Sequence, residues 1–106
     1  MPYSTNFFTG SLPDSEATLY TVPSSYVAVV RDVEVFNGSL DEASFRLDVT
    51  VPGSPTAFWW GINNLASGAV TQWKGRLVLP PSSTISGLAN ESEFFVIVSG
   101  YLLSSP

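Results

Sequence analysis

The sequence predicts an all-β fold, a single eight-stranded antiparallel β-sandwich of jelly-roll or immunoglobulin-like type. Three observations support this prediction. Segments rich in Val, Phe, Tyr, Trp, Thr and Ile, which suit a pleated half-buried surface, recur along the whole chain. Turn-forming residues separate these segments at short intervals and leave little room for helices. The 106 residues are 44% hydrophobic, which is enough to bury one two-layer core.

Eight segments fit a strand by their composition and by the turns that bound them: 5–9, 18–22, 26–37, 43–51, 57–62, 69–79, 83–89 and 93–103. We therefore expect residues 14–106 to form one β-sandwich domain, and residues 1–13 to form either an N-terminal arm or an edge strand. The arm would reach outward to another subunit. Segment 43–51 alternates most clearly, with Phe45, Leu47 and Val49 on one face and polar residues on the other.

Two further features complete the expected fold. The dipeptide Asn37-Gly38 tolerates the positive φ of tight turns, which predicts a hairpin with segments 26–37 and 43–51 as antiparallel neighbours. Apolar residues that share one parity of their strands, or that lie in apolar runs, are expected to form the core: Phe45, Leu47, Val49, Trp73, Leu77, Val96 and Val98.

Composition excludes several kinds of site. The chain has no Cys and no His, which removes cysteine and serine nucleophiles activated by histidine and the usual zinc ligands. Four Lys and Arg against nine Asp and Glu give a net charge of −5, too few cations for a nucleic-acid surface. No apolar run approaches the ~18 residues of a membrane span, and the N-terminus does not resemble a signal peptide. We expect no cofactor, no metal, no nucleic acid and no membrane partner.

Catalysis by carboxylates is also not expected. Neighbouring acids such as Asp32 and Glu34 fall at strand edges or turns, where solvated surface residues are common. The sequence therefore predicts a protein that is not an enzyme. Because only 12% of residues are charged, its surface has less charge than usual to keep other proteins away, which favours a protein partner.

Five residues are candidates for an interface or ligand surface: Phe7, Phe8, Arg31, Trp59 and Trp60. Since adjacent strand residues face opposite sides, one ring of each aromatic pair is expected to need cover from outside its own core. An exposed Trp ring can stack on a sugar or anchor an interface; alternatively, both faces of the strand are covered. Arg31 interrupts an apolar parity and is expected at a carboxylate, a sheet rim, a subunit interface or a solvent-exposed strand end.

Four stretches of the chain share a pattern with a known class of protein. They are residues 21–33 (TVPSSYVAVVRDV), the following Asn37-Gly38, residues 75–81 (GRLVLPP) and residues 96–101 (VIVSGY). Together they resemble small structural proteins of tailed bacteriophages. The resemblance implies a virion component, made in the host cytoplasm, that serves as a head decoration or minor tail protein. It implies contacts with copies of itself and with other virion proteins, and it assigns no ligand-binding residue.

Two function classes therefore remain open at the level of sequence. One is a non-enzymatic virion structural protein that decorates or stabilises a capsid or tail as a homo-oligomer. The other is a carbohydrate-binding or receptor-binding module that uses the Trp-rich region to hold a glycan.

Overall fold

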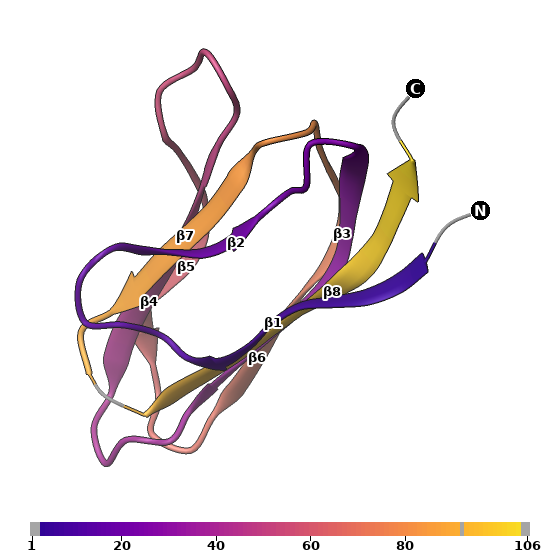
Figure 1. Cartoon of the computed structure of the whole chain (residues 1–106). Helices are drawn as coiled ribbons and strands as arrows, with labels where there is room; N and C mark the ends of the chain where they lie inside the picture. The colour runs from indigo at the N-terminus through magenta and orange to yellow at the C-terminus, as the bar shows by residue number, and fades with distance from the viewer. Residues whose placement is uncertain (1–2, 92, 105–106) are drawn as a thin grey trace.

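The chain forms a sandwich of two four-stranded antiparallel sheets (Figure 1). The computed structural model describes residues 3–91 and 93–104; Met1 and Pro2 of the expected N-terminal segment lie outside the described residues. The strands are β1 (Tyr3–Ser11), β2 (Ala17–Thr21), β3 (Tyr26–Asn37), β4 (Ala43–Thr50), β5 (Ala57–Leu65), β6 (Val70–Leu79), β7 (Thr84–Ala89) and β8 (Phe94–Ser104). All eight expected strands are present, and no boundary differs by more than three residues.

The strand order is that of a jelly roll. Strands pair β1 with β8, β2 with β7, β3 with β6 and β4 with β5, so that the chain is wound up like one long folded hairpin. Contacts of β3 with β8 and of β4 with β7 join these pairs into two sheets. Sheet A has the order β1-β8-β3-β6, and sheet B has the order β2-β7-β4-β5. An immunoglobulin-type sandwich groups its strands differently. No helix long and apolar enough to cross a membrane occurs among the described residues.

Loops gather in two sets at opposite ends of the sandwich (Figure 1). The loops β1–β2, β3–β4, β5–β6 and β7–β8 meet at one end, where Gly38 N donates to the Glu93 carbonyl and Gly68 N to the Asn37 carbonyl. Six carboxylates lie in or beside these loops, and we call this the acidic end: Asp14, Glu16, Asp41, Glu42, Glu91 and Glu93. The loops at the opposite end contain no charged residue and are rich in Pro and Ser.

The hairpin expected at Asn37-Gly38 is wrong. Strands β3 and β4 belong to different sheets, and the chain crosses between them at this point. The Asn37 side chain is fully buried, donates to the carbonyls of Asp41 and Leu65, and accepts from the amide and hydroxyl of Ser39. Asn37 therefore stabilises the wider β3–β4 loop by side-chain hydrogen bonds, and it is not the positive-φ residue of a tight turn.

The core lies between the sheets and contains the predicted residues. Phe45, Leu47, Val96 and Val98 are buried, whereas Val49, Trp73 and Leu77 are partly buried and pack against them. The middle strands β3 and β8 supply much of the fully buried volume, as their apolar sequences predict.

Edge strands close the two open sides of the sandwich with aromatic contacts. Phe7 of β1 lies 4.9 Å from Tyr20 of β2, measured between ring centroids, and closes one side. On the other side, Trp59 of β5 meets Trp73 of β6 edge-on at 5.2 Å. Each contact joins an edge strand of sheet A to an edge strand of sheet B, which ties the two sheets together at their margins.

Candidate interaction surface

The aromatic pairs named from the sequence do not form an outer surface. Phe7 is buried and Phe8 packs against the core, and Trp59 and Trp60 both pack against it as well. The expectation that the two rings of each pair lie on opposite faces is therefore wrong, although Phe8, Trp59 and Trp60 stay partly exposed. Register shifts between Asn6 and Phe8, and across Trp59, mark a β-bulge in each strand. A bulge adds one residue and turns two consecutive side chains towards the same face.

The N-terminal segment is an edge strand in the structure. From residue 3 to residue 11, β1 pairs with β8 of its own chain, and Leu12 N then donates to the Phe94 carbonyl. Of the two alternatives left open by the sequence, this part of the chain has the intradomain one.

Arg31 lies in the middle of β3 and is exposed on the outer side of sheet A. It occupies a bulge. Val30 pairs with Gly100 of β8, and Asp32 pairs with Ser99, the residue directly before Gly100, so Arg31 is an extra residue with no pairing partner on β8. A Cβ atom at Gly100 would overlap the Val29 carbonyl oxygen, so only glycine allows β8 to run beside this bulge. The expected carboxylate partner is not found, since the guanidinium forms no ion pair with any of residues 3–91 or 93–104.

The bulge also resets which residues of β3 face outward. Ala28 and Val30 belong to the core before it, and Val33 and Val35 belong to the core after it. The single parity read from the sequence, with Val29 on the same face as Val33, is therefore wrong. The outward residues of β3 are Val29, Arg31, Asp32, Glu34 and Phe36.

Residues on the outer side of sheet A form rows that cross its strands, and we call this surface the A face. Each row is named here by its β3 residue. From the acidic end they are the Phe36 row (Phe95, Phe36, Val70), the Glu34 row (Ile97, Glu34, Gln72), the Asp32 row (Ser99, Asp32, Lys74), the Arg31 row (Arg31, Arg76) and the Val29 row (Tyr101, Val29, Val78).

The A face carries most of the large apolar side chains that are exposed. Of the six found among the described residues, Phe36, Phe95, Val70 and Val78 lie on it, with exposed fractions from 42% to 62%. The other two are Leu40, in the β3–β4 loop, and Phe58, on the outer side of sheet B. Phe36, Phe95 and Val70 adjoin one another in one row, and contiguous exposed apolar surface marks an interaction site more often than scattered residues do.

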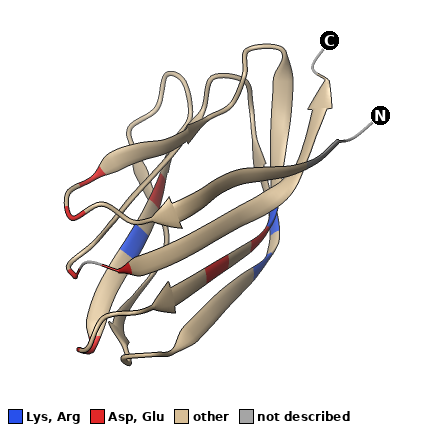
Figure 2. Ribbon diagram, turned by 60° about the horizontal axis from the view of Figure 1, so that its bottom comes forward, with Lys and Arg blue, Asp and Glu red and all other residues tan. Residues whose placement is uncertain are grey.

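Charge is distributed unevenly around the molecule. Three of the four cations lie on the A face, where Arg31, Lys74 and Arg76 stand against Asp32 and Glu34. Figure 2 shows the acidic segments concentrated at the acidic end. The A face therefore has a net charge of +1 in a chain whose total is −5, which leaves −6 for the rest. Within residues 3–91 and 93–104, the A face is the surface that combines exposed apolar groups with a positive balance of charge.

The outer side of sheet B, which we call the B face, is polar and internally bonded. Asp48 is fully buried there, and its Oδ1 accepts from Arg46 Nε at 3.2 Å and from Arg46 Nη2 at 2.9 Å. Arg46 also lies over the Phe58 ring at 5.5 Å. From the β1–β2 loop, Glu16 Oε2 accepts from the Ser86 hydroxyl at 3.0 Å.

Glu16 and Asp48 bring two carboxyl groups together on the B face. Their closeness raises the pKa of Glu16 above its ordinary value of 4.5, because a proton on Glu16 allows a hydrogen bond to the Asp48 carboxylate; the Ser86 hydroxyl works in the opposite direction. Asp48 Oδ2 is buried and accepts no hydrogen bond from the described residues, so a proton on Glu16 would give this oxygen a donor. This pair was not predicted from the sequence, because the two residues lie far apart in the chain.

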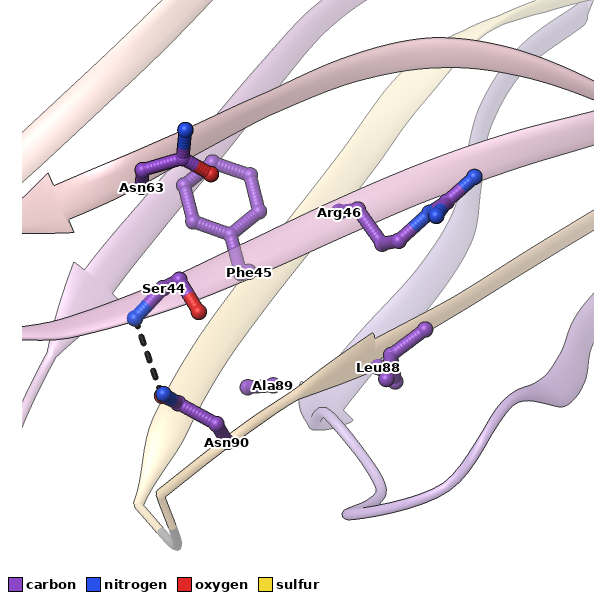
Figure 3. Close-up of a pocket in the computed structure, with 7 residues that line it drawn as sticks. All are labelled: Ser44, Phe45, Arg46, Asn63, Leu88, Ala89 and Asn90. Atoms are coloured by element: carbon purple, nitrogen blue, oxygen red, sulfur yellow. Dashed lines mark hydrogen bonds between the residues drawn. The ribbon is translucent and has the colours of Figure 1, made fainter.

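A small hollow on the B face is shown in Figure 3. It measures about 110 Å³ and is lined by residues of β4, β5 and β7 and of the turn after β7: Ser44, Phe45, Arg46, Asn63, Leu88, Ala89 and Asn90. Ser44 N donates to Asn90 Oδ1 at 2.9 Å, and the Arg46 side chain extends away from Ser44 and Asn63 (Figure 3). Pockets that enclose small ligands are usually roughly 300 Å³ or more.

No group of three or more acidic side chains within residues 3–91 and 93–104 is arranged to hold a metal ion. No protein-family model matches the chain, and no curated protein sequence matches it.

Proposed function

We propose that this chain is a non-catalytic structural protein that acts by protein contacts through its A face, as a component of the virion of a tailed bacteriophage. One observation carries the docking role. The Phe36 row places two half-exposed Phe rings and an exposed Val side by side across three strands. Each Å² of such apolar surface removed from water contributes about 25 cal/mol, so a protein that covers the row gains affinity from it.

The virion assignment has a different basis. It depends on the resemblance of residues 21–33, 75–81 and 96–101 to small phage structural proteins. Jelly rolls include viral capsid proteins, but they also include lectins and cupins, so the fold by itself does not select among these functions. Extensive strand pairing, short loops and aromatic closure of both open sides make a rigid unit, which suits a particle that must persist outside a cell.

A glycan-binding function has less support. The Trp side chains that were candidates for a sugar platform are turned into the sandwich, where Trp60 contacts Phe45 and Trp59 contacts Trp73. Sugar stacking needs an aromatic ring with a free face, and these rings use their surfaces in packing.

The test compares two aromatic surfaces of the same protein. The double variant Phe36→Ser/Phe95→Ser removes the two rings of the Phe36 row, and Phe58→Ser is the matched control because it removes an exposed Phe from the B face. In purified phage particles, quantified by mass spectrometry, we expect the wild-type chain and Phe58→Ser at the same fixed copy number. The double variant should be depleted at least tenfold. Thermal unfolding establishes that all three proteins are folded.

Particles that lack the wild-type chain would contradict the virion assignment. Particles that retain the double variant at the wild-type copy number would contradict docking through the A face.

A further inference from the structure

The A face has a pattern that is complementary to itself when it is read in the opposite direction. The two outer rows, those of Phe36 and Val29, are both apolar; Val29 itself is buried, so Tyr101 and Val78 supply the accessible surface of its row. Between them the Glu34 row is acidic and the Arg31 row is basic. The central Asp32 row is neutral, because Lys74 Nζ lies 3.8 Å from Asp32 Oδ2. Reversing the strand direction exchanges the two apolar rows and places the acidic row opposite the basic one.

We propose that the A face pairs with the A face of a second copy of this chain, with the strands of the two copies antiparallel. The two-fold axis would lie between the two copies of the Asp32 row and run across the strands. Glu34 of each copy would then meet Arg31 of the other. This inference rests on the proposed function, since it names the partner that the A face binds. A two-fold contact uses the same patch twice, which is what a self-complementary pattern provides.

Two hollows on the A face fit this arrangement. One, of about 250 Å³, is lined by Glu34, Phe36, Val70, Phe95 and Ile97. The other, of about 400 Å³, is lined by Arg31, Ser99, Tyr101 and neighbouring residues of β1. The first lies towards the Phe36 row and the second towards the Val29 row, so antiparallel pairing brings each hollow towards the other hollow of the second copy. Arg31, which has no ion-pair partner among the described residues of its own chain, faces the hollow that contains Glu34 of the other copy.

The size of the A face also suits a second copy. Four strands about 4.8 Å apart and rows that span eight residues of β3 give a patch of roughly 500 Å² in projection. Accessible area exceeds projected area, and a stable interface covers about 800 Å² on each partner. Face-to-face sheets pack about 10 Å apart with nearly aligned strands, so all five rows can be in contact at once.

The acidic end of a second copy is the other surface that matches the cations of the A face. It would satisfy Arg31 and Arg76, but it would cover the apolar Phe36 and Val29 rows with carboxylates, which lose hydration without a partner there. A second A face supplies apolar groups and opposite charges in the same order. The observations therefore favour the face-to-face pair.

A charge-exchange experiment separates these arrangements. Glu34→Arg makes both rows that flank the neutral Asp32 row basic, and Arg31→Glu/Arg76→Glu makes both of them acidic; the side chains of all three residues are exposed. By sedimentation equilibrium at low salt, we expect the wild-type protein to dimerise. Each variant alone should dimerise at least roughly 100-fold more weakly, because like charges face each other. An equimolar mixture of the two variants should restore a 1:1 heterodimer, which weakens as salt is added.

Asp41→Lys/Glu42→Lys is the matched control at the acidic end, and it should dimerise like the wild-type protein. Loss of the dimer in this control would show that the acidic end is the partner and would overturn the inference, as would a mixture that stays monomeric. A wild-type protein that is monomeric yet loses particle binding in Phe36→Ser/Phe95→Ser would also overturn it, while the proposed function would stand.

Discussion

The outer surfaces of the two sheets differ in how fully their groups are satisfied. On the B face, charged groups are bonded to one another: Arg46 donates two hydrogen bonds to the buried Asp48 and lies over the ring of Phe58, which is itself exposed. On the A face, Arg31 has no ion-pair partner among the described residues, and Phe36 and Phe95 are half exposed. Both sheets have four strands and share one core. The difference therefore lies in the outward side chains, and it is the reason for proposing that a partner completes the A face.

The largest effect expected from this comparison concerns backbone contacts beneath each face. A methyl group at Gly100, in the inner strand β8, would overlap the Val29 carbonyl of the neighbouring inner strand. At Gly61, in the edge strand β5, it would meet the Phe45 carbonyl, but an edge strand can move outward to make room. We expect Gly100→Ala to lower the free energy of unfolding by about 3 kcal/mol and Gly61→Ala by about 1 kcal/mol. Urea unfolding measures both values.

If Gly100→Ala and Gly61→Ala were equally stable, the loss of stability would not depend on whether the strand lies inside its sheet or at its edge. If Gly100→Ala were as stable as the wild-type protein, the close approach of β8 to the Arg31 bulge would be contradicted.

A smaller effect separates the ion pairs of the two faces. Asp48 is buried and accepts two charged hydrogen bonds from Arg46, whereas Asp32 pairs with Lys74 across 3.8 Å in a solvated setting. We expect Asp48→Asn to cost about 2 kcal/mol of unfolding free energy, since a bond to a charged group is lost beneath the surface. Asp32→Asn should cost about 0.5 kcal/mol or less. Urea unfolding measures both losses of stability. Equal losses for Asp48→Asn and Asp32→Asn would contradict the claim that the ion pair of the B face is the stronger of the two.

Strand positions followed from the sequence, but the edges of the sheets did not. Alternation in β4 and apolar runs in β3 and β8 were enough to place strands and much of the core. The alternation of inward and outward side chains is interrupted by bulges in three edge strands, β1, β2 and β5. Each bulge turns two adjacent apolar residues inward: Phe7-Phe8, Leu19-Tyr20 and Trp59-Trp60. Bulges at sheet edges also hinder unwanted strand pairing. Adjacent large apolar residues in an otherwise alternating edge strand are the pattern that would have predicted them.

The candidate surface was beyond sequence analysis for a different reason. Arg31 was singled out, but the rows around it combine residues from β3, β6 and β8 whose register depends on the strand order and on the bulge itself. Gly100, which permits that bulge, gave no sign of its role in the sequence. Phe36 shares its parity in the sequence with Ala28 and Val30, which lie in the core, and only the reset of parity at Arg31 places Phe36 outside.

The smallest expected effect is a pH dependence confined to the B face. The pKa of Glu16 is raised, first because of its contact with Asp48, while Ser86 and Arg46 oppose the shift. A raised carboxyl pKa means that folding favours the protonated form of Glu16. The contribution of this proton to stability is therefore complete below pH 4.5 and is lost as pH rises through the pKa of the folded protein.

Glu16→Gln keeps a hydrogen-bond donor towards Asp48 at every pH. We therefore expect the variant to melt slightly higher than the wild-type protein at pH 7, and the difference in Tm to shrink towards zero as pH falls below 4.5. Glu42→Gln in the exposed β3–β4 loop is the matched control, and the Tm difference between it and the wild-type protein should show no such convergence. A Tm difference for Glu16→Gln that stays constant from pH 4 to pH 7 would show that Glu16 and Asp48 do not share a proton in the folded protein.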